Sequence, residues 1–199
     1  MHLPNPAPTL QSCPLTAEAF APFGSVVEGF APPGTPGAAP PPGARAINDG
    51  TTWRLDLTHD LDLQREGGTP GLAIYSAAAR QFPFMLEVLE RHELGSQGFL
   101  PLTGARFVVV VAAAGTAPGI EDLKAFHTTG QQGVVLHPGT WHHALLAVEA
   151  GSFAVIERHL APNGHATDHA TDHTMARPVD CGLATLSAPV RLEAPFRLR

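Results

Sequence analysis

The sequence is poor in lysine, cysteine and charge. Its single lysine, Lys124, lies in the polar stretch PGIEDLKAF and is expected to be exposed, which argues against covalent catalysis through a lysine Schiff base. The chain has eleven arginines and only one lysine. Because a guanidinium group can bind an anion with two parallel hydrogen bonds, this composition favours a protein that binds anions through arginine. The two cysteines, Cys13 and Cys181, are far apart in the sequence, so no disulfide framework is expected and a reducing cytoplasm is the predicted location.

Charged residues make up 15% of the chain, and the net charge is −6. Nucleic-acid backbones and anionic membranes both require a basic face, so neither is a predicted partner. No apolar run approaches the roughly twenty residues of a membrane-spanning helix. The first ten residues, MHLPNPAPTL, have neither the basic region nor the apolar core of a signal peptide.

The chain does contain enough apolar sequence, 44% of 199 residues, to bury the core of one domain. We predict a single catalytic domain over residues 1–160 and a partly flexible C-terminal extension over 161–199. Residues 31–43 hold six prolines and three glycines and are expected to form a loop. The repeat HATDHATDH at 165–173 would align three histidines on a helix, as in zinc sites, but its lack of an apolar face predicts a mobile, solvated segment.

From residue 71 the chain becomes a series of short β-branched or aromatic-rich runs, separated by Gly, Pro, Ser or Thr. The runs are GLAIYS, FMLEVLERH, QGFLPL, RFVVVVAA, GVVLH, HALLAVE and SFAVIERH. This pattern predicts an all-β sandwich or barrel. Two helical stretches are expected beside it: one over 14–24, with Thr16 as N-cap and Gly24 at its end, and a helix-like insert over 119–127.

Two segments carry the residues that could perform chemistry, and the first is LERHELGSQGFLPLTG at 89–104. On a strand, Glu90 and His92 point to the same face, and the turn ELGS then brings Gln97 back on the return strand. These three side chains can therefore form an inward cluster. The alternative is an exposed polar pair on the rim, which we consider less well supported because the neighbouring apolar residues face the core.

The second segment is GVVLHPGTWHH at 133–143. Its Pro-Gly pair makes a turn, so His137 ends one strand and Trp141 begins the next. Adjacent strand residues face opposite ways, so only one of His142 and His143 can face a pocket, and we choose His142. Trp141 is expected to be a packing anchor, and Tyr75, the only tyrosine, is left as core or pocket wall.

The spacing H-x4-Q, followed by G-x4-PG-x2-H, resembles the two sequence motifs of the cupin barrel. That family uses three histidines and a glutamate as metal ligands, and the matching positions in this chain are Glu90, His92, Gln97 and His142. Two of the four ligand types differ. Two histidines, a carboxylate and an amide would hold a divalent ion more weakly than three histidines. The resemblance implies a divalent metal such as Ni, Mn or Zn and no organic cofactor.

A narrower resemblance covers residues 14–160. LERHELGSQGFLPL, GVVLHPGTWHH and SFAVIERH together resemble ureidoglycolate lyase, as do LTAEAFAPFGSVVE, INDG and FPFMLEVLERH. The resemblance implies an all-β fold, a cupin-like antiparallel β-barrel or jelly roll with a few short helices, in a homodimer. It also implies a carbon–nitrogen lyase of the amidine-lyase type, which cleaves ureidoglycolate to glyoxylate and urea in allantoin and purine degradation.

The site roles follow from this resemblance. His142 or His92 would act as base or metal ligand, Glu90 would orient that histidine, and Gln97 would hydrogen-bond the substrate hydroxyl or carboxylate. For the small carboxylate substrate, Arg158 on the closing strand would form the clamp. The family has an arginine where this chain has Ser76, with Arg80 the nearest candidate to replace it.

Two other functions stay open at this point. One is a metal-dependent cupin oxygenase or isomerase that acts on a small carboxylate. The other is a non-catalytic cupin-like protein that binds a small ligand, which the presence of Ser76 makes plausible.

Overall fold

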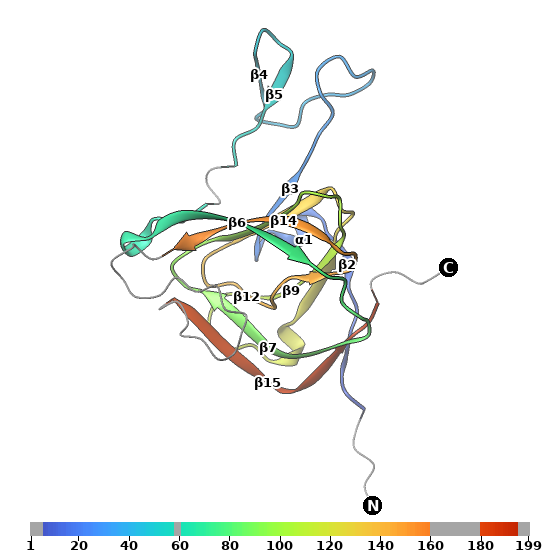
Figure 1. The fold of residues 1–199 in the computed structure, drawn as a ribbon, viewed down its shortest axis with the longest axis vertical. Coiled ribbons are helices and arrows are strands. Elements are labelled where there is room, and N and C mark those ends of the chain that lie inside the picture. Colours follow the sequence, from blue (N-terminus) through green and yellow to red (C-terminus); the bar gives the residue numbers. More distant parts are fainter. Residues whose placement is uncertain (1–5, 58–60, 160–179, 195–199) are drawn as a thin grey trace, which may run out of the picture.

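The computed structural model describes residues 6–57, 61–159 and 180–194. It confirms the prediction of an all-β chain: two β-sheets face one another and curl into a barrel of the cupin type (Figure 1). Within these residues, no helix is long and apolar enough to cross a membrane.

The smaller sheet has five strands, all paired antiparallel. In spatial order they are β3 (Gly24–Glu28), β11 (Gln132–Leu136), β8 (Gln97–Pro101), β14 (Gly151–His159) and β6 (Thr69–Ala77). The larger sheet has eight strands: β1 (Thr9–Leu10), β15 (Cys181–Leu192), β7 (Phe84–His92), β12 (Trp141–His142), β9 (Phe107–Ala112), β10 (Lys124–His127) and β2 (Cys13–Pro14), with β13 (Leu146–Ala147) also paired to β9.

The central strand β9 separates two apolar cores. Its residues are all buried, and alternate side chains point to opposite faces of the sheet. Phe107, Val109 and Val111 join the core between the two sheets. Val108 and Val110 join a second core on the other face, to which β15 contributes Leu186, Val190 and Leu192. The nearly continuous apolar run RFVVVVAA thus belongs to a strand that is covered on both faces, the environment in which such runs are expected.

The helical expectations are confirmed only in part. Thr16 does cap a helix by accepting a hydrogen bond from the Ala19 N–H at 3.2 Å, but α1 (Ala17–Phe20) is shorter than expected. Gly24 does not close it. Gly24 begins β3, where a β-carbon would lie 2.0 Å from the Val135 carbonyl oxygen. The expected helix-like insert over 119–127 is wrong: it consists of a single turn, η3 (Ile120–Asp122), followed by strand β10.

The C-terminal part contains a strand that the sequence analysis did not foresee. β15 pairs with β7 along most of its length, with a bulge between Thr185 and Val190. The histidine repeat at 165–173 lies outside the described residues.

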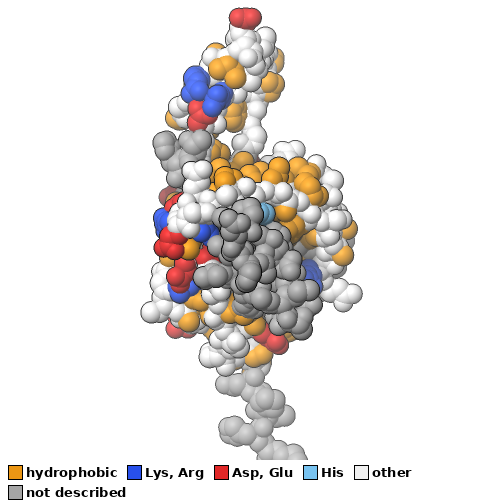
Figure 2. Space-filling model, turned by 60° about the vertical axis from the view of Figure 1, so that its left-hand side comes forward, with side chains coloured by type: hydrophobic (Ala, Val, Ile, Leu, Met, Phe, Trp, Pro, Cys, Tyr) orange, Lys and Arg blue, Asp and Glu red, His pale blue; other side chains and the backbone are white. Residues whose placement is uncertain are grey.

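The segment 29–57 forms an arm that stands away from the barrel (Figures 1 and 2). Its proline-rich part, 31–43, contains turns and no strand or helix, as predicted. The hairpin of β4 (Arg45–Ile47) and β5 (Thr52–Arg54) forms its tip. A further single turn, η2 (Arg65–Gly67), precedes β6.

Candidate active site

Three side chains from neighbouring strands of the larger sheet meet inside the barrel. Strand β12 lies between β7 and β9, so His142 is directly opposite Glu90 on one side and Val111 on the other. Val111 belongs to the core between the sheets, and His142 therefore faces that interior as well. One ligand atom each of Glu90, His92 and His142 lies within 4.8 Å of the others. The predicted clustering of these three residues is confirmed.

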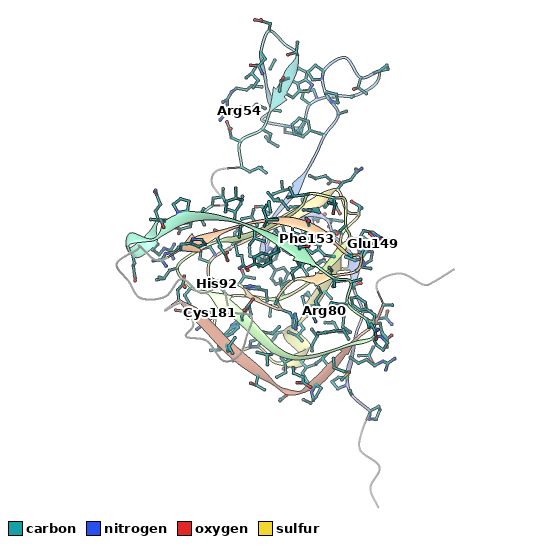
Figure 3. The ribbon with its side chains drawn as sticks, in the orientation of Figure 1. Arg54, Arg80, His92, Glu149, Phe153 and Cys181 are labelled. Atoms are coloured by element: carbon teal, nitrogen blue, oxygen red, sulfur yellow. The ribbon has the colours of Figure 1, made fainter. Side chains whose placement is uncertain are left out.

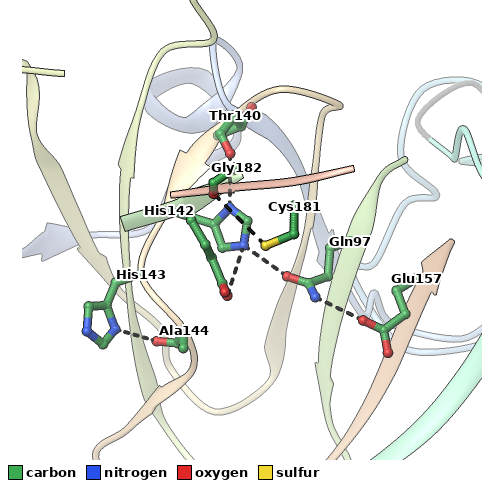
Figure 4. A network of polar contacts seen from close by, with 9 residues as sticks. Gln97, Thr140, His142, His143, Ala144, Glu157, Cys181 and Gly182 are labelled. Carbon is green, nitrogen blue, oxygen red and sulfur yellow. Dashed lines mark hydrogen bonds and ion pairs between the residues drawn. The ribbon is translucent and has the colours of Figure 1, made fainter. Parts of the chain in front are cut away.

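The imidazole of His142 is held at both nitrogens. Nδ1 lies 2.9 Å from the Thr140 carbonyl oxygen, which can only accept, so Nδ1 carries a hydrogen (Figure 4). Nε2 lies 3.0 Å from Oε1 of Gln97 and 3.6 Å from Oε1 of Glu90. Burial lowers the pKa of His142 to about 4, although the bond to Thr140 acts in the other direction. The neutral ring therefore presents its Nε2 lone pair to the site.

Gln97 connects this histidine to a second buried carboxylate. It lies opposite Glu157 in the β8–β14 pair, and its Nε2 donates to Oε2 of Glu157 at 3.0 Å (Figure 4). Gln97 and Glu157 are both almost fully buried. The chain of contacts thus runs from Thr140 through His142 and Gln97 to Glu157, across both sheets.

The contact between Gln97 and His142 depends on how the amide is turned. A carbonyl oxygen and an imidazole lone pair both accept hydrogen bonds, so the pair is satisfied only by a protonated Nε2 or by a reversed amide. A cation on Nε2 would remove the conflict, because the lone pair would then have a partner. Glu157, which accepts from the amide nitrogen, favours the orientation that leaves Oε1 toward His142.

His92 provides a second observation that fits a bound cation. Its side chain points into the space between the sheets (Figure 3), and its ring centroid is 5.5 Å from that of His142. Burial, followed by the neighbouring His142, lowers the pKa of His92, so this ring is also neutral. Among the described residues, its buried Nε2 has no hydrogen-bond partner. A buried polar atom without a partner is costly and calls for an explanation, and a metal ion would provide one.

Tyr75 also belongs to this site. On β6 it pairs with the fully buried Phe153 and faces the interior. Burial, Glu157 and Glu90, in that order, raise the pKa of Tyr75 to about 12. Near neutral pH the phenol therefore keeps its proton, so that it can act as a hydrogen-bond donor and not as a proton-accepting phenolate. In the sequence, alternation along GLAIYS places Tyr75 and Ala73 on the same face of the strand. It does not tell which face points into the barrel, so it could not assign Tyr75 to the site.

Three predicted substrate-binding residues lie elsewhere. The Arg158 guanidinium donates to the carbonyls of Arg65 and Glu66 at 2.9 and 3.3 Å and contacts Asp180 at 3.4 Å. Ser76 is exposed on the face of β6 opposite to Tyr75. The guanidinium of Arg80 lies over the Phe84 ring, 5.8 Å from its centroid. The structure brings Glu90, His92, Gln97 and His142 together, but not these three, whose substrate contacts stay predictions.

The remaining residues of the WHH segment make contacts away from the three-residue cluster. Trp141 is buried in the second core, with its indole N–H bonded to the Thr116 carbonyl at 3.0 Å and Arg91 over its ring, so it is the packing anchor that we predicted. Nδ1 of His143 lies 2.8 Å from the Ala144 carbonyl oxygen, and its ring meets Phe84 edge-on. His143 thus lies outside the three-residue cluster.

The cupin-like barrel, with two histidines and a carboxylate converging in its interior, defines a cupin-type protein with a candidate metal site. Residues 7–177 match the model of the ureidoglycolate lyase family. The chain is 44% identical to ureidoglycolate lyase of Burkholderia mallei (strain NCTC 10229) over 151 residues, which are 75% of this chain and 82% of that protein. It is 38% identical to the protein of the same name from Pseudomonas putida (strain W619), over 84% of this chain and 95% of that protein. The chain belongs to the ureidoglycolate lyase family.

Proposed function

We propose that this chain cleaves ureidoglycolate to glyoxylate and urea. The match of residues 7–177 to the family model carries this proposal, and the converging Glu90, His92 and His142 support it. The comparisons do not favour an oxygenase, an isomerase or a non-catalytic binding protein. We place the reaction in allantoin degradation within purine breakdown, and we propose the cytoplasm as its location and a homodimer as its form.

The donor set fits a divalent metal. Glu90, His92 and His142 would hold it, and imidazole with carboxylate suits Zn, Mn or Ni. A bound cation would lower the pKa of the substrate hydroxyl. Its presence is tested by elemental analysis of the purified protein. His165, His169 and His173 are replaced by alanine in that preparation, so that the repeat does not scavenge metal.

The reaction requires one proton to move from oxygen to nitrogen. Ureidoglycolate carries a hydroxyl and a urea nitrogen on the same carbon. As the hydroxyl loses its proton, the C=O bond of glyoxylate forms and the C–N bond breaks, with its electron pair going to nitrogen. That nitrogen then takes up a proton and leaves as urea, so protons balance overall. One carboxylate that accepts and returns a proton is sufficient as general base and acid.

Glu90 is the best placed of the site residues for this proton transfer. Its side chain is 25% exposed, whereas that of His142 is 2% exposed, so Glu90 is more accessible to a substrate. One of its oxygens faces His142 Nε2 and would bind the cation, and the second oxygen of the carboxylate can accept the hydroxyl proton. Tyr75, with its phenol held protonated, donates a hydrogen bond to the departing urea or to the substrate carboxylate.

Gln97 and Glu157 orient rather than react. Glu157 holds the amide nitrogen of Gln97, and this leaves the amide oxygen directed at the imidazole of His142. The predicted carboxylate clamp by Arg158 would require the substrate to replace Asp180 on Nη1. The proposal does not depend on this exchange.

Urea release from racemic ureidoglycolate tests the function. We expect release by the wild type and a loss of about 10²–10⁴-fold in His142→Ala, the range for general acid–base and related positioning groups. His143→Ala is the matched control, because it removes the histidine that follows His142 in the chain and lies outside the three-residue cluster, and it should retain activity. No release by the wild type with any of Ni, Mn or Zn added would overturn the proposal. A fully active His142→Ala would overturn the site assignment alone.

A further inference from the structure

The outer face of the five-stranded sheet is apolar and exposed. On the edge strand β6, Leu72 and Ile74 are 71% and 63% exposed, and Leu102, just beyond β8, is 57% exposed. Residues directly opposite one another on paired strands share a face, so Ile156 and Ala154 extend the apolar surface behind Leu72 and Ile74. Large aliphatic side chains this exposed, and contiguous, mark an interaction surface rather than ordinary solvent-facing residues.

This outer face, defined by Leu72, Ile74, Leu100, Leu102, Ala154 and Ile156, carries no charged side chain among those residues. The chain as a whole has a net charge of −6, which opposes the approach of two copies wherever like charges face each other. Two copies of the outer face can meet without like charges opposite each other. An isologous contact, in which each copy uses the same patch, is the commonest arrangement of homodimers.

The arm stands on the same side of the molecule as this outer face. Figure 1 shows the arm rising beyond β3, β14 and β6, and Figure 2 shows hydrophobic side chains on the barrel surface below the arm. The hydrogen bonds and ion pairs described for residues 29–57, such as those of Arg45 and Arg54 with Asp56, all close within the arm. Phe30 and Leu57 on the arm are 39% and 36% exposed.

A two-stranded hairpin is marginally stable by itself in water and needs a surface to pack on. The outer face alone is also too small for a stable dimer. Three strands of five residues and two of nine, about 4.8 Å apart, present roughly 540 Å², whereas a stable interface buries about 800 Å² per partner. An arm that reaches over the other copy supplies the missing contact area.

We propose that two copies of this chain associate through the outer face of the five-stranded sheet, with the arm of each copy lying against the other. This surface rests on the homodimer proposed above and not on the lyase chemistry. It places Leu72 and Ile74 within the contact of the two sheets and Phe30 and Leu57 in the contact made by the arm. Ser76, exposed on the same face of β6, lies in or beside this contact.

Light scattering after size-exclusion chromatography tests the surface. We expect the wild type at twice the chain mass of 20.9 kDa and the double variant Leu72→Glu with Ile74→Glu at the mass of a single chain. The matched control is Met85→Glu with Leu183→Glu, which adds the same two charges at positions 41% exposed on the other sheet, and it should remain dimeric. Circular dichroism checks that each variant folds. Leu72→Ser with Ile74→Ser, which adds no charge, replaces the glutamate pair if that pair fails to fold.

The arm is tested separately by Phe30→Ser with Leu57→Ser, which should shift the dimer toward monomer in a dilution series. A monomeric wild type overturns the homodimer itself. A dimer that survives in both outer-face variants overturns this surface while the homodimer stands. An arm variant that dissociates no more readily than the wild type overturns the contribution of the arm. Urea release is measured in parallel, so that loss of activity is not mistaken for loss of association.

Discussion

Replacing Glu157 by glutamine preserves shape and removes one charge at the end of the contact chain. In the wild type, Oε2 of Glu157 accepts from Nε2 of Gln97 at 3.0 Å, with both side chains buried. A hydrogen bond to a charged group contributes about 1.5–3 kcal/mol, against about 1 kcal/mol for a neutral pair. A glutamine at 157 can also donate, so the amide of Gln97 is no longer held in one orientation. We expect a cost of about 1–2 kcal/mol in the transition state, or roughly 5–30-fold in kcat.

The assay is urea release, with kcat and KM determined separately. Because Gln97 orients His142, the loss should fall on kcat while KM changes little. Glu149→Gln is the control, since Glu149 bonds Arg106 at the surface, and it should retain wild-type kinetics. The chain has one tyrosine, so phenolate absorbance reports on Tyr75 alone. Burial and then Glu157 raise the pKa of Tyr75 to about 12, and in Glu157→Gln the phenol should ionise at lower pH. Unchanged kcat together with an unchanged tyrosine titration would refute the reasoning.

Three further predictions follow from the same site. Burial lowers the pKa of His142 from 6.5 to about 4. Between these two pH values the unfolded chain binds a proton that the folded protein does not. The free energy of unfolding of the metal-free protein should therefore fall by about 3 kcal/mol as the pH drops through this window. Thermal unfolding measures it, and a midpoint that stays level from pH 6.5 to 4 contradicts it. Tyr75→Phe removes one donor and should lower kcat/KM about 10-fold without changing the unfolding midpoint; unchanged kinetics would exclude Tyr75 from the reaction. A chelator should abolish urea release, and Ni, Mn or Zn should restore it in the wild type but not in His92→Ala; full activity in metal-free protein would contradict a metal role.

Strand alternation was sufficient to predict most of the cluster. It placed Glu90 and His92 on one face and separated His142 from His143, and the structure confirms both. Gln97 was predicted from the turn that follows, and its 3.0 Å contact with His142 agrees. These inferences succeed because a period of two depends only on local backbone geometry.

Alternation does not say which face of a strand points into the barrel, and for this reason the sequence did not identify the residue of the closing strand that faces the site. On the closing strand, Glu157 shares the face of Phe153 and Val155, so Glu157 and not Arg158 faces the site. Strand β15 was missed because it is separated from the rest of the barrel in sequence and is broken by a bulge. Its pairing with β7 is non-local and leaves no short-range signal.

The most direct test of the central claim is to measure the products of ureidoglycolate together. Cleavage of the C–N bond at the hydroxyl-bearing carbon releases urea intact, so we predict glyoxylate and urea in equal amounts, without ammonia. Both should disappear in the double variant Glu90→Gln with His142→Ala, which removes the carboxylate and the imidazole that lie 3.6 Å apart. Ammonia in place of urea, or equal product formation by this variant, would contradict the account.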